Sequence, residues 1–444
     1  MTLEEIFNAK LTENGDIAFK KVSDNNLLNI LFMTEYYQKH LEQIPVLEDN
    51  DISRLFAMFI RDPRYGLGRR DLGRKLMSMT DVSVEDIIKA GRVDDLFHIE
   101  YPSIYSFACV LDYLYEEIVK NNELVKKWMP RYSSKHLELA RRIAQYYGMN
   151  KQEYGHFIKC NTTENKLSDH RYDDIEFEHV PSLAMIKYAK AFSTKPETKE
   201  RYAQYLADVK AGKKDLKVST TTVYDIYKNR KVIDADLFFD KLEKISGSWI
   251  PIVDSSGSMQ DSNDSYGKAM AIGHYLAKCS SYAPNKVISF SSQPELITLG
   301  DMSVSRWGYY RREKEYSSKY EKEIDSMHTG DCSNTDFGAV MRLLSHLDGK
   351  LPEYLVVLSD MEFDMGSYYS KEATMNLFKS KGYNTKIVWW NLNSRHTTAP
   401  EMDNNGNIFL SGYTPMLLKY LEAGFDGNMF LYKLLREYAK AIQK

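Results

Sequence analysis

Residues 249–259 read Trp-Ile-Pro-Ile-Val-Asp-Ser-Ser-Gly-Ser-Met, an apolar run that ends abruptly in small, oxygen-bearing side chains. The β-branched residues Ile250, Ile252 and Val253 are typical of a buried central strand. Gly257 allows the chain to turn sharply behind that strand. The stretch therefore predicts a core strand followed directly by a polar loop.

Three side chains of this loop carry hard oxygen atoms. Asp254 supplies a carboxylate, and Ser256 and Ser258 supply hydroxyls. Such oxygens suit Mg²⁺ or Mn²⁺, and also Ca²⁺, whereas the loop offers no thiolate or imidazole that would favour zinc. The loop therefore predicts one part of a divalent-cation site, and a serine-rich turn behind an ordinary core strand is the alternative.

Two later stretches have the composition to complete this site. Thr335 precedes a helix expected over residues 336–347, and Asp360 ends an apolar run over residues 355–360. From residue 249 onward strands alternate with helices, which predicts a doubly wound parallel sheet with helices on both faces. The carboxyl ends of parallel strands gather at one edge, where ligand sites form. We therefore expect one ion, with an open position for an oxygen of a partner, at Asp254, Ser256, Ser258, Thr335 and Asp360.

The order and spacing of these five residues resemble the metal-ion-dependent adhesion site (MIDAS) of the von Willebrand factor A (vWA) domain. That site has the signature Asp-x-Ser-x-Ser, followed by a Thr and then an Asp, and all five positions match here. The resemblance implies that residues 247–444 form a vWA domain with a Rossmann-like sheet. It favours a site that binds a partner through the ion rather than one that catalyses a reaction.

Residues 1–246 have the periodicity of helices. Apolar residues recur at helical spacing, for example Leu27, Leu31 and Phe32. Repeated short helices joined by brief loops are typical of an α-solenoid-like array, although no sequence repeat is evident. Helices are expected over residues 24–41, 52–61, 83–90, 103–119, 134–147, 181–192 and 199–210.

Several blocks of this helical region carry a second resemblance. They lie at residues 55–70, 91–97, 126–131, 180–185 and 205–213. With the C-terminal domain, they resemble a family of largely uncharacterised proteins that pair a helical region with a vWA domain. That family is similar to the TROVE module of the Ro RNA-binding proteins. The resemblance implies a HEAT-like helical region and, as a ligand, RNA or a ribonucleoprotein.

A cluster of basic residues in the helical region could bind phosphate. Gly66 and Gly68 would let the backbone approach a phosphate, and guanidinium groups would bind its oxygens in a salt-sensitive way. The alternatives are a solvated helix face with internal acidic partners, or a buried Arg61–Asp62 pair. The candidate phosphate-binding residues are Arg64, Arg69, Arg70, Arg74 and Lys127.

Composition narrows the class of protein. The hydrophobic fraction of 43% and charged fraction of 27% are those of an ordinary globular protein, and a net charge of −3 argues against general coating of nucleic acid. Four cysteines without a CxxC pair indicate reduced thiols. With no secretory signal or membrane-spanning run, we expect a cytoplasmic protein, or one packaged in a viral or phage particle, with no membrane partner.

Three functions remain open at this level, and the oligomeric state is open too. There is no P-loop, HExxH motif or nucleophile elbow, so we expect no enzymatic activity. The first function is binding of RNA or a ribonucleoprotein, and the second is a protein assembly scaffold in which a partner's carboxylate completes the ion's coordination. The third and weakest is a metal-dependent phosphohydrolase. A continuous basic groove joining Arg64, Arg70 and Lys127 would favour RNA, whereas scattered charges would favour protein.

The charged stretch at residues 306–327 predicts an exposed helical insertion, because its charges alternate in sign. Its tyrosines could stack on bases or contact a protein partner. A plain surface helix is the simpler interpretation.

Overall fold

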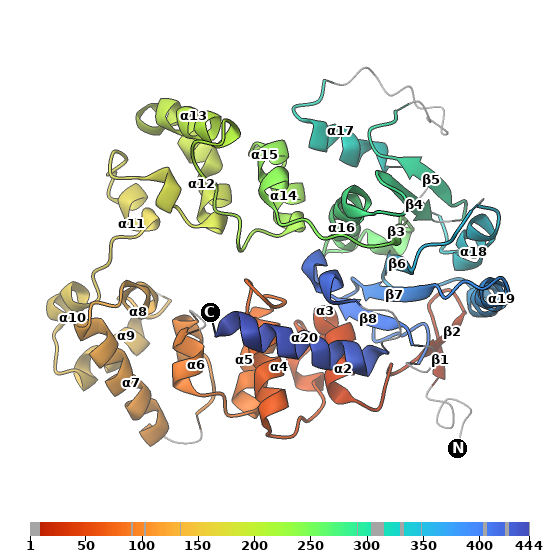
Figure 1. The fold of residues 1–444 in the computed structure, drawn as a ribbon. Coiled ribbons are helices and arrows are strands. Elements are labelled where there is room, and N and C mark those ends of the chain that lie inside the picture. The colour runs from red at the N-terminus through yellow and green to blue at the C-terminus, as the bar shows by residue number, and fades with distance from the viewer. Residues whose placement is uncertain are drawn as a thin grey trace. The chain divides into compact units, whose positions relative to one another are not determined.

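The computed structural model describes residues 9–89, 92–101, 104–133, 135–290, 292–302, 315–328, 333–347, 349–402, 406–421 and 426–443. The chain divides into two compact units (Figure 1). We call them the sheet unit, Met1–Val46 with Val218–Glu437, and the helical unit, Leu47–Lys217 with Tyr438–Lys444. The sequence predicted a division after residue 246, whereas the contacts of the folded chain group residues 218–246 with the sheet.

The helical unit contains helices and short 3₁₀ segments, and no strand lies among its described residues, as the sequence predicted. Asn50 begins the first helix by accepting a hydrogen bond from the Ser53 backbone N–H, and the helix buries Phe56 and Phe59. The elements are α4 (Asp51–Arg61), α5 (Arg70–Met79), α6 (Val84–Lys89), η2 (Val93–Phe97), α7 (Ile104–Val119), α8 (Glu123–Trp128), α9 (Leu137–Tyr146), α10 (Lys151–Phe157), α11 (Thr163–Ser168), η3 (Phe177–His179), α12 (Ser182–Thr194) and α13 (Pro196–Lys210).

The sheet unit is built on six strands in the order β5-β4-β3-β6-β7-β8. The inner strands are parallel and the edge strand β5 pairs antiparallel with β4, so the sheet is mostly parallel, within the predicted doubly wound α/β class. Strand β4 ends at Phe290 and β5 begins at Glu295, and so few residues between two strands permit only antiparallel pairing. The strands are β3 (Trp249–Asp254), β4 (Lys286–Phe290), β5 (Glu295–Thr298), β6 (Tyr354–Ser359), β7 (Lys386–Asn391) and β8 (Ile408–Ser411).

Helices cover both faces of this sheet, as predicted for a doubly wound α/β fold. Successive side chains of a strand point to opposite faces, so Val253 and Leu358, paired in register, share one face. Gly273 of α16 (Ser265–Cys279) packs on that face against Val253. Trp389, which belongs to the opposite face, contacts Phe337 of α18 (Phe337–Ser345).

The N-terminal residues include a feature that the sequence did not predict. Strands β1 (Ala9–Leu11) and β2 (Ile17–Phe19) form an antiparallel hairpin, where mostly helical structure was expected. The Thr12 hydroxyl donates a 2.7 Å hydrogen bond to the Phe363 carbonyl, so the hairpin packs on the loop behind β6. Each strand is only three residues long, too short to show an alternating pattern.

The remaining elements of the sheet unit follow the predicted alternation. The insertion expected as an exposed helix at residues 306–327 forms α17 (Lys319–Ser326), which instead buries Tyr320 and Ile324. Residues 303–314, with two of its tyrosines, lie outside the described part. No helix in the described part is long and apolar enough to cross a membrane. The other elements are α2 (Asn26–Phe32), α3 (Thr34–Tyr37), η1 (Leu41–Gln43), α14 (Val223–Asn229), α15 (Ala235–Lys241), η4 (Gly257–Met259), α19 (Ser367–Ser380), η5 (Pro415–Tyr420) and α20 (Gly427–Ile442), whose last residues belong to the helical unit.

Candidate functional site

Asp254 lies at the carboxyl end of β3 and is completely buried. Its Oδ2 atom accepts a 2.6 Å hydrogen bond from the hydroxyl of Ser359, the last residue of the neighbouring strand β6. Its Oδ1 atom accepts a 2.9 Å hydrogen bond from the Ser256 backbone N–H. The strand register thus fixes this carboxylate at the sheet edge, and the serine loop folds back over it.

Ser256, Ser258 and Asp360 lie close to Asp254. The hydroxyls of Ser256 and Ser258 are 3.1 Å apart. The Ser258 hydroxyl and the charge of Asp254 both act on the pKa of Asp360, which places Asp360 beside the serine loop. Four of the five residues predicted for an ion therefore meet at the carboxyl ends of β3 and β6.

Thr335 is connected to this cluster through Asp364. The Thr335 carbonyl accepts a 2.9 Å hydrogen bond from the Asp364 backbone N–H, and the charge of Asp364 acts on the pKa of Asp254. Thr335 itself is completely buried, just before α18. Its carbonyl therefore lies beside the segment behind β6 that carries Asp364.

Two buried oxygen atoms of this cluster have no hydrogen-bond partner among the described residues. They are Oγ1 of Thr335 and Oδ2 of Asp360. A buried polar atom without a partner costs roughly 1–3 kcal/mol, so such atoms are rare unless an ion or water satisfies them. Both are hard oxygens of the kind that Mg²⁺ accepts, so the residues present fit a divalent cation.

The electrostatics of the cluster also fit a cation. Burial raises the pKa of Asp254, and hydrogen bonds from Ser359 and Ser256 oppose that rise. Burial raises the pKa of Asp360 as well, and the charge of Asp254 raises it further. Two buried carboxylates that repel each other would be stabilised in their ionised form by a positive ion between them.

The donor set is poor in charged ligands. No group of three or more His, Cys, Asp or Glu side chains that could hold a metal occurs in the described ranges. The candidate site has only two carboxylates, Asp254 and Asp360, and its other donors are hydroxyls. Such a set would leave an ion electron-poor and ready to take an oxygen from a partner.

Arg395 also belongs to this site, although no sequence pattern predicted it. One of its guanidinium nitrogens lies 3.7 Å from Asp360 Oδ2, and it donates a 3.0 Å hydrogen bond to the Ser258 carbonyl. Its side chain is 43% exposed, and Ser258 is half-buried, so the cluster faces solvent on this side. Arg395 follows β7 in an irregular loop, and no pattern in the sequence relates it to the serine loop.

Glu362, two residues beyond Asp360, is held in place by hydrogen bonds to both of its carboxylate oxygens. One of its carboxylate oxygens accepts a 2.8 Å hydrogen bond from the Glu13 backbone N–H, and the other accepts one of 2.8 Å from Thr398. The side chain is almost fully buried. It holds the N-terminal hairpin to the loop behind β6.

The basic residues predicted for phosphate separate into different environments. Arg69 is only 5% exposed, so little of its side chain is accessible to a phosphate. Arg64 is exposed and lies over the ring of Tyr65, 4.8 Å from its centroid. Arg74 donates hydrogen bonds of 2.8 Å to Asp94 and 2.6 Å to Asp95.

Arg61 and Asp62, which the sequence suggested as a buried ion pair, each contact other residues instead. Arg61 donates a 3.0 Å hydrogen bond to Asp95, which is completely buried. Asp62 instead accepts a 2.8 Å hydrogen bond from the Arg64 backbone N–H. Asp95 therefore joins Arg61 and Arg74, on α4 and α5, in one ionic network of the helical unit.

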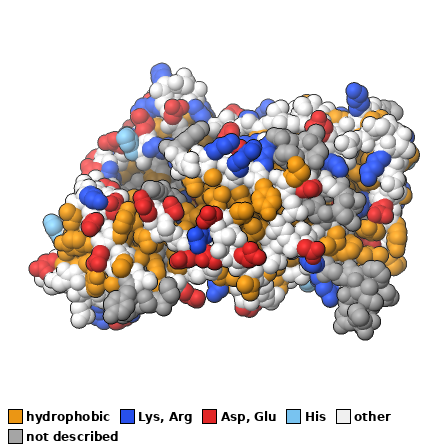
Figure 2. Space-filling model, turned by 60° about the horizontal axis from the view of Figure 1, so that its bottom comes forward, with side chains coloured by type: hydrophobic (Ala, Val, Ile, Leu, Met, Phe, Trp, Pro, Cys, Tyr) orange, Lys and Arg blue, Asp and Glu red, His pale blue; other side chains and the backbone are white. Residues whose placement is uncertain are grey.

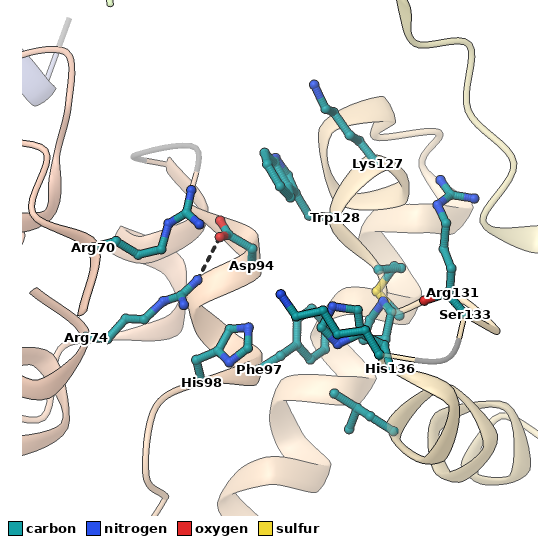
Figure 3. A pocket seen from close by; sticks show the side chains of 14 residues that line it. Arg70, Arg74, Asp94, Phe97, His98, Lys127, Trp128, Arg131, Ser133 and His136 are labelled. Atoms are coloured by element: carbon teal, nitrogen blue, oxygen red, sulfur yellow. Dashed lines mark hydrogen bonds and ion pairs between the residues drawn. The ribbon is translucent and has the colours of Figure 1, made fainter. Parts of the chain in front are cut away.

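Within the helical unit, a cavity of about 390 Å³ brings three of the predicted basic residues together (Figure 3). Arg70 and Arg74 of α5 line one side, and α8 contributes Lys127 with Trp128 on the other. Arg64 and Arg69 do not line it. Additional lining residues that the sequence analysis did not single out are Phe97, His98, Arg131, Lys135 and His136.

One face of the chain is mixed in charge. On the face shown in Figure 2, Lys and Arg side chains are interspersed with Asp and Glu side chains, and no continuous basic band is visible.

Two family models match parts of the chain. One, described as Domain of unknown function (DUF7788), matches residues 248–429, and the other, described as Domain of unknown function (DUF2828), matches residues 118–250. The two ranges meet at the start of β3.

The chain also resembles a curated protein and a solved structure. An uncharacterized protein of Acanthamoeba polyphaga mimivirus is 22% identical, over 93% of this chain and 84% of the relative. The crystal structure of the Deinococcus radiodurans RO (RSR) protein is similar with a TM-score of 0.48 and 12% identity, over 94% of this chain and 99% of that one.

Proposed function

We propose that this chain is a non-enzymatic binding protein that depends on a divalent cation. Mg²⁺, or Mn²⁺ or Ca²⁺, would be held by Asp254, Ser256, Ser258, Thr335 and Asp360. When bound, the ion would offer an open position to a carboxylate or phosphate oxygen of a partner. The observation that carries this proposal is that two buried oxygens, Oγ1 of Thr335 and Oδ2 of Asp360, have no hydrogen-bond partner among the described residues.

The position of Glu362 supports binding rather than hydrolysis. Hydrolysis at a metal site needs a group that activates water, or a second metal. Both Glu362 oxygens already accept hydrogen bonds, so this carboxylate is not placed to act as a base. A phosphohydrolase, which would have to use Asp364, is the weaker alternative.

The Asp254→Ala variant tests the metal site. Wild-type protein should gain about 2.7 kcal/mol of stability at a Mg²⁺ concentration 100-fold above the Kd. The variant should show no Mg²⁺-dependent rise in melting temperature. Glu353→Ala removes an exposed carboxylate outside the cluster and should behave like wild type. An equal Mg²⁺ shift in wild type and Asp254→Ala would contradict the proposal.

A second function, RNA or ribonucleoprotein binding, is proposed for the helical unit. The pocket that gathers Arg70, Arg74 and Lys127 is the observation in its favour. Guanidinium and ammonium groups bind phosphate oxygens, and the affinity falls as salt displaces them.

Reversing two of these charges tests RNA binding. The combined Arg70→Glu and Lys127→Glu variant should retain much less RNA at moderate salt than wild type does. Lys213→Glu changes an exposed lysine of the same unit away from the pocket and is the matched control. Wild type that binds no RNA at low salt would remove this function and leave the metal proposal standing.

An assembly scaffold without an RNA role is the alternative, and the mixed charges of Figure 2 favour it. In that case a partner's Asp or Glu would bind at the ion. We further propose action in the cytoplasm or packaging in a viral or phage particle.

A further inference from the structure

The side chains that line the pocket of Figure 3 carry more positive charge than negative charge. Five cationic side chains line it, against a single carboxylate, Asp94. Asp94 is already paired with Arg74 at 2.8 Å. Arg70 and Lys135 are exposed and have no hydrogen bond or ion pair within the described ranges of the chain. The pocket therefore has two cations available for an anion from outside.

The same pocket offers an aromatic surface. Trp128 and Phe97 line it and are half-buried, so each ring keeps part of its surface open. In Figure 3, Trp128 lies across the cavity from Arg70. Nucleic-acid bases stack on such rings, and the stacking is worth roughly 1–3 kcal/mol per base.

The size of the pocket selects among anionic ligands. A volume of about 390 Å³ is at the small end of ligand cavities and suits one nucleotide rather than a segment of duplex. A base inside a duplex is paired and stacked on its neighbours, so it cannot lie against Trp128. Only an unpaired base can turn outward while its phosphate reaches nearby cations.

We infer that this pocket binds one unpaired nucleotide of single-stranded RNA, with the base on Trp128 and a phosphate at Arg70 and Lys135. The inference rests on the proposed RNA-binding function and specifies its ligand. It adds Trp128 and Lys135 to the residues involved, and it requires that single strands bind better than duplexes.

Fluorescence anisotropy with the full chain tests the inference. The probes are a short labelled oligouridine RNA and a blunt-ended RNA duplex. Wild type should prefer the single strand. Trp128→Ala should weaken single-strand binding about tenfold, and Trp128→Phe, which keeps a ring, should retain most of it. Lys135→Glu should also weaken binding and reduce the slope of the salt dependence by about one.

The controls distinguish failure of the RNA-binding function from failure of the inference about this pocket. Lys213→Glu should bind like wild type, and circular dichroism should show that each variant is folded. Wild type that binds no RNA would overturn both the RNA function and this inference. Wild type that binds RNA while Trp128→Ala and Lys135→Glu bind equally well would overturn only the inference. The inference would also be overturned if wild type bound the duplex as tightly as the single strand. It would be overturned too if polyglutamate competed fully with the RNA and Trp128→Ala had no effect.

Discussion

Arg395 places a guanidinium nitrogen 3.7 Å from the Oδ2 atom of Asp360, an oxygen without a hydrogen-bond partner in the described structure. A fixed positive charge thus lies beside the proposed cation site. It opposes a metal ion by repulsion, but it would attract the anionic oxygen of a partner that completes the ion's coordination.

Removal of this charge should strengthen metal binding. The Arg395→Ala variant should bind Mg²⁺ roughly threefold more tightly at low salt, since the guanidinium is partly exposed and its repulsion is screened. Isothermal titration calorimetry measures the change. Lys379→Ala, which removes an exposed lysine of α19, should leave the affinity unchanged. Weaker Mg²⁺ binding by Arg395→Ala would mean that its hydrogen bond to the Ser258 carbonyl matters more than its charge.

The two buried aspartates should make stability depend on pH. Their pKa values in the folded protein are raised by burial above the unfolded value of about 3.9, so the metal-free folded state binds more protons than the unfolded state. This contribution is complete below about pH 4 and is lost as the pH rises towards neutrality.

Melting temperatures measured with EDTA and with Mg²⁺ across that range test the effect. The loss should appear with EDTA and be largely suppressed by Mg²⁺, which stabilises the ionised carboxylates. Asp360→Asn removes one titrating group and most of the repulsion, so it should flatten the EDTA profile relative to wild type. A variant profile parallel to that of wild type would argue against raised pKa values at this site.

The network around Asp95 should carry much of the stability of the helical unit. Asp95→Asn keeps the side-chain shape but leaves Arg61 and Arg74 without their buried counter-charge, which should cost about 3–5 kcal/mol. Urea unfolding followed by circular dichroism measures this loss. Arg70→Ala, on the pocket surface, should change stability by less than about 0.5 kcal/mol. Equal stability of the two variants would show that the network is dispensable.

RNA binding should strengthen as the pH falls, because of His98. Burial lowers the pKa of His98, the positive charges of Arg74 and His136 lower it further, and Asp94 and Asp95 raise it. A phosphate in the pocket would raise that pKa, so protons and RNA would bind together.

Anisotropy titrations between about pH 5.5 and pH 7.5 would show this linkage. His98→Gln should flatten the pH dependence, whereas His346→Gln, an exposed histidine of the sheet unit, should not. A pH dependence that survives in His98→Gln would assign the titration to another group.

The local sequence pattern determined much of the fold of this protein. The apolar run at residues 249–254 predicted β3, and the alternation behind it predicted an α/β sheet with helices on both faces, which the structure confirms. It also predicted that Asp254 and Asp360 would lie at one sheet edge, because parallel strands bring their carboxyl ends together. The ion itself stays a prediction.

Only tertiary packing decided which residues surround each charged side chain. Arg69 and Arg70 are adjacent in sequence, yet one is buried and the other lines the pocket, because the start of α5 turns their side chains to different surroundings. Trp128 faces Arg70, and Arg395 lies beside Asp360, only because distant segments pack together. Periodicity encodes the type of an element and its buried face, whereas the partners of a charged side chain depend on contacts between residues far apart in the chain.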